Sequence, residues 1–289
     1  MGLTRAAAFD DMAAFDTIMT WTEEHLAVRS DALLAWRWTA DPKKPVADTN
    51  NASDGDLFYA WALSSVAARH KRAELGARAE NIARDLAAIC IVDHPGGGGD
   101  RLFLPGADGF RTEKGVVVNP SYYMPRAMTD LAAATDVDAL ARLATDGTKM
   151  IEGMAKSGLV PDWAEVTAKG WKAPPKRFAA NAGYEAIRVP LFAAWSGQAK
   201  SPAIARYVAA ASRNDPANPA TVFDRKTGKP LEHSDAPGYQ AVAALVGCAS
   251  GTPGAAMPLF SNQQPYYPAT LHLMALVAQV ENYSQCVPV

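Results

Sequence analysis

Two carboxylates flank a glycine in the stretch NNASDGDLFYAWAL, residues 50–63. Asp54 and Asp56 precede a run of aromatic and aliphatic residues that is typical of a buried helix. In the structural interpretation, Ser53 or Asp54 caps this helix, and acids in the first turn suit the helix dipole. In the chemical interpretation, acids close to tryptophans take part in acid–base chemistry on a sugar. The spacing alone favours the cap.

The composition is that of a large globular chain with little net charge. The 289 residues are 49% hydrophobic and have a formal net charge of −2. A sizeable core can therefore form, and no basic excess indicates binding to nucleic acid or an anionic membrane. We find no transmembrane stretch and no signal peptide in the sequence, so no stable membrane insertion is expected. The seven tryptophans and nine tyrosines can fill a core or stack on sugar rings.

The three cysteines fit no metal-binding spacing, and no Cys/His cluster indicates a metal or another cofactor. Cys90 lies in the apolar run LAAICIV and is expected to be a buried thiol. Cys248 and Cys286 can pair if the chain is exported, a question that the sequence leaves open.

Helical periodicity dominates the chain, and strand signals are few and short. A first helix is expected almost from the first residue to about His25, and short strands are expected in RLFLPGADGF and GVVV. No linker divides the chain, and no fixed repeat period is present, so we expect one mostly α domain, such as an α/α toroid. Further helices are predicted at about 54–70, 72–92, 137–156, 183–195, 201–212, 236–249 and 265–283, and GVVVNPSYYMPRAMTDLAAAT is expected to run from a strand through a turn into a helix.

Several segments, in order and over nearly the whole chain, resemble glycoside hydrolase family 8. ASDGDLFYAWAL is similar to the family signature, and the resemblance is strongest to the bacterial endoglucanases that accompany cellulose synthase. The other segments that carry the resemblance are FDTIMTWTEEHL, LLAWRW, GFRTEKGVVVNPSYYMP, GLVPDW and GYEAIRVPLFAAW.

The resemblance implies an all-α fold, the (α/α)6 barrel, with a cleft for a β-1,4-glucan and a few short strands in loops. It implies a single catalytic domain over residues 1–289 and an inverting reaction that uses two carboxyl groups and no cofactor. The expected partners are β-1,4-glucan oligosaccharides or cellulose, with the cellulose synthase system as a further candidate. The expected location is the periplasm or the outside of the cell.

The resemblance also assigns roles to individual residues. Glu185 stands at the general-base position, and Arg188, three residues later, would orient its carboxylate. Asp54 matches the acid that contacts the sugar in the central subsite and helps it distort, and Tyr122 matches a tyrosine near the attacking water. Asp56 is expected chiefly to hold local structure. The candidate substrate-binding residues are Trp36, Trp38, Asp56, Tyr123, Tyr184 and Tyr267.

Two departures from the family pattern bear on activity. The family's general acid is a glutamate in a Ser-Glu-Gly motif, whose tail Met1, Gly2 and Leu3 match, so we expect the domain to be incomplete at its N-terminus. Glu185 stands where the family usually has Asp, which moves the carboxylate by about 1.5 Å, and an error of that size can cost about a hundredfold in rate.

Two hypotheses follow from these departures. The first is an inverting endo-β-1,4-glucanase, or cellulase, whose sequence begins too late. The alternative is a glucan-binding, catalytically impaired family member that lacks the general acid. Cellulose, mixed-linkage glucan, xylan and chitosan all remain open as substrates, and the similarity to the cellulose-synthase companions favours cellulose.

Overall fold

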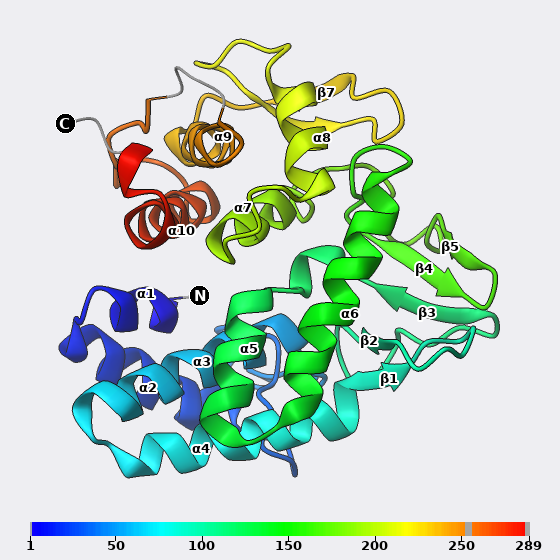
Figure 1. Cartoon of the computed structure of the whole chain (residues 1–289). Helices are drawn as coiled ribbons and strands as arrows, with labels where there is room; N and C mark the ends of the chain where they lie inside the picture. The colour runs from blue at the N-terminus through cyan, green and yellow to red at the C-terminus, as the bar shows by residue number, and fades with distance from the viewer. Residues whose placement is uncertain (1, 252–255, 287–289) are drawn as a thin grey trace. The chain divides into compact units, whose positions relative to one another are not determined.

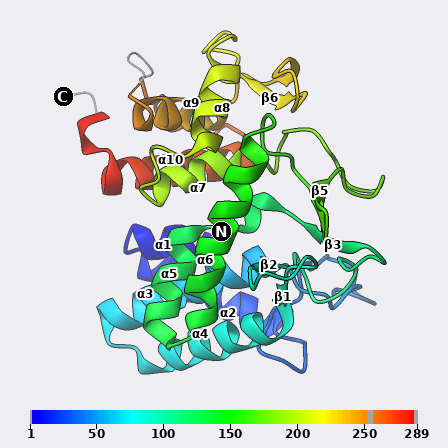
Figure 2. The ribbon, with the colours of Figure 1, turned by 45° about the vertical axis from the view of Figure 1, so that its right-hand side comes forward.

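The chain forms two compact units in a computed structural model that describes residues 2–251 and 256–286. The helices α5 (Pro125–Thr135) and α6 (Asp138–Ala155), green in Figures 1 and 2, contribute residues to both units. Unit 1 comprises Met1–Val118, Ala127–Gly147 and Val166–Gly170. Unit 2 comprises Asn119–Arg126, Thr148–Glu165 and Trp171–Val289.

Unit 1 is built on helices that bury their apolar faces. Helices α3 and α4 run side by side, with Leu57, Phe58 and Ile82 fully buried along them. The strands β1 and β2 pair antiparallel, with Ile91 opposite Phe103. The elements are α1 (Gly2–Ala8), α2 (Met12–Leu26), α3 (Ser53–His70), α4 (Ala73–Asp85), the π-helical turn η1 (Leu86–Cys90), β1 (Ile91–Asp93), β2 (Arg101–Phe103) and β3 (Gly115–Val118).

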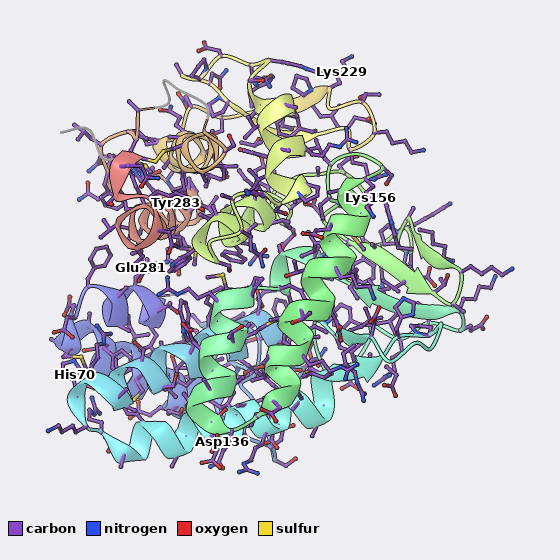
Figure 3. The ribbon with its side chains drawn as sticks, in the orientation of Figure 1. His70, Asp136, Lys156, Lys229, Glu281 and Tyr283 are labelled. Atoms are coloured by element: carbon purple, nitrogen blue, oxygen red, sulfur yellow. A yellow bond between two sulfur atoms is a disulfide. The ribbon has the colours of Figure 1, made fainter. Side chains whose placement is uncertain are left out.

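The first predicted helix is broken into α1 and α2. Asp10 adopts a φ of 58°, a left-handed conformation that a helix cannot continue through. The side chain of Asp11 then caps α2 by accepting a hydrogen bond of 3.0 Å from the N–H of Ala14. His70 at the end of α3, labelled in Figure 3, places Nε2 2.7 Å from Asp10 Oδ1 and holds this corner.

The predicted cap of α3 is wrong. The N-cap position falls on Ala52, which has no side-chain acceptor, so neither Ser53 nor Asp54 caps the helix. The Ser53 hydroxyl instead donates a hydrogen bond of 2.6 Å to the carbonyl of Leu104. The two acids lie in the first helical turn, where negative charge is favourable.

Unit 2 contains four α-helices in its described part, together with short strands. A Cβ on Gly238 would lie 1.8 Å from the carbonyl oxygen of Pro268, so a glycine is required where α9 and α10 run side by side. The elements are η2 (Pro120–Tyr122), β4 (Ala164–Thr167), β5 (Gly170–Lys172), α7 (Arg188–Trp195), α8 (Pro202–Ala211), β6 (Ala220–Phe223), β7 (Pro230–His233), α9 (Pro237–Ala249), α10 (Tyr266–Asn282) and η3 (Ser284–Cys286).

The strands form small sheets. β6 pairs antiparallel with β7, and β3, β4 and β5 form a sheet in that order. The predicted helices at 137–156, 201–212, 236–249 and 265–283 agree closely with α6, α8, α9 and α10. Throughout the described ranges, no helix has the length and apolar character needed to cross a membrane.

The end of α10 is fixed to α7 by side-chain hydrogen bonds. Glu281, labelled in Figure 3, accepts hydrogen bonds from the indole N–H of Trp195 at 2.6 Å and from Arg126 at 2.7 Å. The hydroxyl of Tyr283 donates to the carbonyl of Ala194 at 3.0 Å. These bonds hold the residues that follow α10 close to the core of unit 2.

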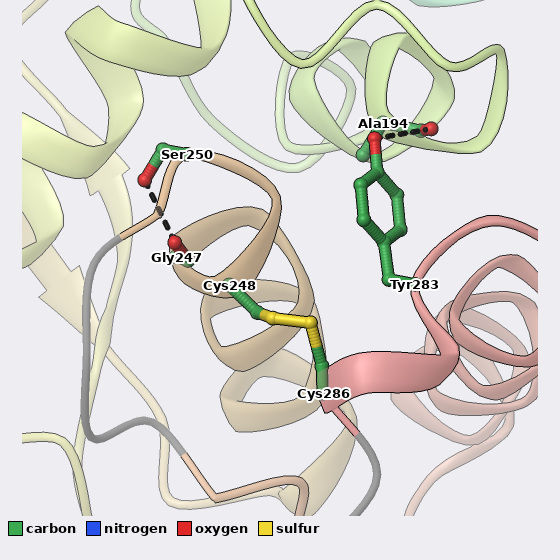
Figure 4. The surroundings of a disulfide bond; sticks show 6 residues. All are labelled: Ala194, Gly247, Cys248, Ser250, Tyr283 and Cys286. Atoms are coloured by element: carbon green, nitrogen blue, oxygen red, sulfur yellow. Dashed lines mark hydrogen bonds between the residues drawn. A yellow bond between two sulfur atoms is a disulfide. The ribbon is translucent and has the colours of Figure 1, made fainter.

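A disulfide bond links Cys248 at the end of α9 to Cys286 in η3, as Figure 4 shows. The two Cα atoms lie 6.2 Å apart, within the usual range for a disulfide. The pairing that the sequence left open is therefore formed, while Cys90 is a free and fully buried thiol, as expected.

Removing this disulfide is expected to destabilise unit 2. The bond closes a loop with a sequence separation of 38, and a cross-link of that length contributes about 2–4 kcal/mol. We expect Cys286→Ser to lower the melting temperature of the oxidised protein by several degrees. Dithiothreitol should lower the melting temperature of the wild type to that of the variant and leave the variant unchanged. Equal melting temperatures for the two oxidised proteins would contradict this prediction.

Candidate active site

Glu185 lies in a turn, residues 183–187, that leads into α7. The predicted helix began at Gly183, but α7 begins at Arg188. Asp162 accounts for the difference, because its Oδ1 accepts hydrogen bonds from the backbone N–H groups of Gly183, Glu185 and Ala186 at 2.9, 3.1 and 2.8 Å. One buried carboxylate oxygen thus satisfies three N–H groups at a helix start, which have no partners within the helix.

The carboxylate of Glu185 is held through one oxygen. Oε2 accepts a hydrogen bond of 3.0 Å from the amide of Asn119 and pairs with the guanidinium of Arg188. Within the part of the chain that the structure describes, Oε1 has no protein hydrogen-bond partner, and the side chain is 36% exposed. A fixed carboxylate with one accessible oxygen can take a proton from water.

The orientation of the Asn119 amide follows from its neighbours. Its Oδ1 accepts hydrogen bonds from the N–H and the hydroxyl of Ser121, at 3.0 and 2.7 Å, so its NH₂ group must face Glu185. The Ser121 hydroxyl lies 3.4 Å from Glu185. The Ser121 hydroxyl has one proton, and it donates this proton to Asn119 Oδ1, which is nearer than the Glu185 carboxylate. Both residues are fully buried, which makes this a rigid support for the Glu185 carboxylate.

A row of aromatic rings lies next to the ion pair between Glu185 and Arg188. The guanidinium of Arg188 lies 5.6 Å from the centroid of the Tyr122 ring, a cation–π arrangement. The Tyr122 and Trp163 centroids are 6.1 Å apart, and the Trp163 and Phe178 rings are tilted relative to each other with centroids 4.7 Å apart. The structure therefore brings together Tyr122, Glu185 and Arg188, three of the candidate residues.

Two of the candidate tyrosines lie beside Glu185. The hydroxyl of Tyr267 donates to the carbonyl of Tyr184, and the ring of Tyr239 lies between theirs, 6.3 and 6.4 Å from the two centroids. Burial raises the pKa of Tyr267, so its hydroxyl stays protonated and can donate. Tyr184 is 44% exposed, whereas Tyr123 is 1% exposed and belongs to the interior.

The candidates of unit 1 lie around the start of α3. Asp54 is partly buried, and its Oδ1 accepts a hydrogen bond of 2.8 Å from the N–H of Gly55. A cavity of about 230 Å³ beside it is lined by Trp36, Ala52 and Gly55, among others. The Trp36 ring is 48% exposed, and its indole N–H donates to Asp48 at 3.0 Å. A half-exposed indole at a cavity is suited to stacking on a sugar.

Trp38 belongs to a small exposed aromatic cluster. Its ring meets Trp21 edge-on at 5.5 Å and His25 at 5.8 Å, while Trp21 and His25 stack at 4.5 Å. Trp21 and Trp38 are 40% and 36% exposed. Trp38 is thus held by its neighbours and still presents part of its ring to solvent.

Asp56 has the surroundings of a structural carboxylate. It is 1% exposed, and its two oxygens accept hydrogen bonds of 2.8 Å from the N–H of Leu34 and from the amide of Asn51. These bonds connect the start of α3 to the LLAWRW segment. Burial raises the pKa of Asp56 to about 7, against the opposing effect of the Asn51 hydrogen bond.

The buried Asp56 is expected to make stability fall as the pH rises. The folded protein retains a proton on Asp56 up to about pH 7, whereas the unfolded chain releases it at about pH 3.9. The stabilising effect of protonation is thus fully present below the unfolded pKa and is lost as the pH rises through the folded pKa. In this window Asp56 lowers the free energy of unfolding by at most about 1.4 kcal/mol per pH unit.

Urea unfolding of the wild type and of Asp56→Asn at pH 4.5, 6 and 8 measures this effect. The amide of Asp56→Asn does not titrate. The free energy of unfolding of the variant should therefore rise relative to that of the wild type as the pH increases, in addition to a difference that is the same at every pH. Asp54→Asn, in the same helical turn, is the control and should retain the fall in stability with rising pH, because Asp56 is still present. Parallel curves for the wild type and Asp56→Asn would show that Asp56 does not titrate in this window.

Sequence reasoning missed three residues that support Glu185, namely Asn119, Ser121 and Asp162. All three lie in quoted segments, NPSYYMP and GLVPDW, but no role was assigned to them. For Asp162 a signal was present, because the single acid within the mostly apolar stretch GLVPDW is expected to be buried and therefore to need partners. Nothing in the local sequence identifies those partners.

Within residues 2–251 and 256–286, no group of three or more His, Cys, Asp or Glu side chains is arranged to hold a metal ion.

Comparison with known proteins places this geometry in context. The family model described as "Glycosyl hydrolases family 8" matches residues 1–281. A probable endoglucanase from Novacetimonas hansenii is 32% identical over 97% of this chain and 81% of its own length. An endoglucanase from Cellulomonas uda is 32% identical over 66% of this chain, and the match spans about half, 53%, of that relative's length.

Solved structures of endoglucanases also match this chain. The endo-beta-1,4-glucanase CMCax from Acetobacter xylinum matches with a TM-score of 0.87 and 26% identity, covering 97% of this chain and 87% of that one. An endoglucanase from Komagataeibacter sucrofermentans matches with a TM-score of 0.86 and 31% identity, covering 98% and 87%. The predicted fold class, an all-α fold of the (α/α)6 barrel type, is confirmed by these matches.

Proposed function

Because the chain belongs to glycosyl hydrolases family 8, we propose that it is an endo-β-1,4-glucanase that hydrolyses its substrate with inversion at the anomeric carbon. The observation that carries the proposal is the Glu185 carboxylate, held at Oε2 by Asn119 and Arg188 and accessible at Oε1. We further propose that residues 1–289 act as one catalytic domain.

Glu185 is the general base of the proposed reaction. Its Oε1 takes a proton from a water molecule as the water oxygen attacks the anomeric carbon. In an inverting reaction a carboxylic acid on the opposite side of the sugar would protonate the leaving oxygen, about 6.5–9.5 Å from the base so that the water fits between them. The resemblance assigns this role to the glutamate of the Ser-Glu-Gly motif and to none of the residues named above. Arg188 and Asn119 hold the Glu185 carboxylate in place through Oε2.

The substrate is proposed to be a β-1,4-glucan, with cellulose as the favoured polymer. Asp54 accepts hydrogen bonds from the hydroxyl groups of the distorted sugar at the reacting centre, and these bonds strengthen in the transition state. Trp36, Trp38 and Tyr184 offer partly exposed rings on which sugar units stack. Asp56 and Tyr123 are buried and do not contact the glucan. They support the chain segments that carry the substrate-binding side chains.

We propose a location in the periplasm or outside the cell. The disulfide between Cys248 and Cys286 supports an oxidising compartment. The endoglucanase relatives are consistent with a protein that meets a polysaccharide outside the cytoplasm. The cellulose synthase system is a proposed partner on the sequence resemblance alone.

The experiment uses two substrates that differ in their need for an acid. Reducing-end release from carboxymethylcellulose requires both the base and the acid. β-Cellotetraosyl fluoride requires chiefly the base, because fluoride leaves without protonation. Proton NMR of the first product gives its stereochemistry, and the α-anomer is expected from the β-fluoride.

Each outcome decides a part of the proposal. Release of the β-anomer first would overturn the inverting mechanism. Glucan binding without turnover of either substrate would overturn hydrolysis and favour the glucan-binding alternative. Cleavage of xylan or chitosan in preference to cellulose would replace the proposed substrate.

A further inference from the structure

We propose that Asp162 is a positioning residue for this hydrolysis, which holds the backbone of the 183–187 turn so that Glu185 meets the attacking water. The inference rests on the proposed role of Glu185 as general base. It concerns a residue that makes no described hydrogen bond to the Glu185 carboxylate and whose described hydrogen bonds to the turn all go to main-chain N–H groups.

The contact between Asp162 and the turn is unusually dense. A single oxygen, Oδ1, accepts from three N–H groups within the four residues 183–186, one of which is the N–H of Glu185 itself. Hydrogen bonds to a charged acceptor are stronger than those between neutral groups. The turn leads directly into α7, whose N-terminal end also favours a negative charge.

The position of Asp162 is itself fixed. Its side chain is buried, and its own N–H donates a hydrogen bond of 2.8 Å to the carbonyl of Asn181. A Cβ placed on Gly183 would lie 2.9 Å from Asp162 Oδ2. The carboxylate therefore lies directly against the Cα of Gly183, and residue 183 has no room for a side chain unless Asp162 moves.

Glu185 is thus held at both ends by different parts of the chain. Asp162 bonds its backbone N–H, while Asn119 and Arg188 hold its carboxylate at Oε2. Removing the Asp162 acceptor leaves three buried or partly buried N–H groups without a partner, so the turn must rearrange to satisfy them. A displacement of about 1 Å at a reacting group can cost about a hundredfold in rate.

Three variants separate the parts of this proposal. Asp162→Ala removes the acceptor, and Asp162→Asn keeps an oxygen of the same shape without the charge. Gly183→Ala leaves both partners chemically intact but presses a methyl group against Oδ2. Glu165→Gln is the matched control, because Glu165 is an equally buried acid on β4 that pairs with Lys172 at 3.0 Å and makes no hydrogen bond to the turn among those described.

The first measurement is steady-state fluoride release from β-cellotetraosyl fluoride. We expect Asp162→Ala and Gly183→Ala to lower kcat about a hundredfold with KM changed by less than about threefold, since a misplaced base affects the chemical step and not glucan binding. Asp162→Asn should lose about tenfold or less, because its amide oxygen can accept the same N–H groups. Glu165→Gln should retain the wild-type kcat.

The second measurement is amide hydrogen exchange at Gly183, Glu185 and Ala186, which does not depend on catalysis. These amides should exchange faster in Asp162→Ala than in Glu165→Gln, with the amides of α7 unchanged. A wild-type kcat in Asp162→Ala, or unchanged exchange at the turn, would overturn the inference. If the wild type shows no turnover that depends on Glu185, the proposed function fails, and the exchange experiment still decides whether Asp162 holds the turn.

Discussion

Glu185→Gln is expected to abolish measurable hydrolysis, with kcat for β-cellotetraosyl fluoride reduced about 10³-fold or more. The amide has nearly the same shape as the carboxylate and can still accept the Asn119 hydrogen bond, but it cannot take a proton from water. Because the fluoride substrate needs little acid assistance, a loss of turnover on this substrate reports on the base alone.

A second substitution distinguishes a lost base from a damaged site. Glu185→Ala opens space beside the anomeric carbon, where added azide can attack without giving up a proton. Azide should restore fluoride release and yield the α-glycosyl azide, as the C–N bond forms and the C–F bond breaks. Glucan binding of both variants should match the wild type, whereas Glu185→Ala should lower the melting temperature, because it leaves Arg188 and the Asn119 amide without their acceptor. Turnover of Glu185→Gln at the wild-type rate would remove Glu185 from the mechanism.

Asp54→Asn is expected to lower kcat about 10²-fold with a small change in KM. Hydrogen bonds to the sugar at the reacting centre strengthen in the transition state and supply several kcal/mol in such enzymes, and a neutral amide accepts more weakly than a carboxylate. The helix itself should persist, because the N-cap position of α3 belongs to Ala52 and not to Asp54. Initial rates on both substrates, measured over a range of concentrations, give the two constants.

Asp56→Asn is the matched control for Asp54→Asn, since the two acids are in the same helical turn. Asp56 is buried and bonded at both oxygens, so its substitution should change stability and its pH dependence while turnover stays near that of the wild type. A wild-type kcat for Asp54→Asn, or an equal loss of kcat for Asp56→Asn, would mean that the two acids do not divide function and structure in this way.

Most of the secondary structure could be predicted from the sequence, because it depends on local features. The helix expected at 201–212 illustrates this: Ser201 caps α8 by accepting from the N–H of Ala203, and Pro202 occupies the first helical position. The errors arose where a distant group changed a helix end. Ser53 was expected to cap α3, but its hydroxyl bonds to Leu104, which is 51 residues away.

The amino-acid sequence by itself determined the family and the candidate residues, because short segments such as ASDGD and NPSYY carry the resemblance. It also determined which helices form, because capping residues and apolar periodicity act over a few residues. Only the tertiary structure decided how Glu185 is held, since Asn119 lies 66 residues before it and Asp162 lies 23 residues before it. The tertiary structure likewise decided that Asp56 is buried and that Cys248 pairs with Cys286. Such contacts join segments far apart in the chain, and no local spacing in the sequence records which polar group will satisfy which partner.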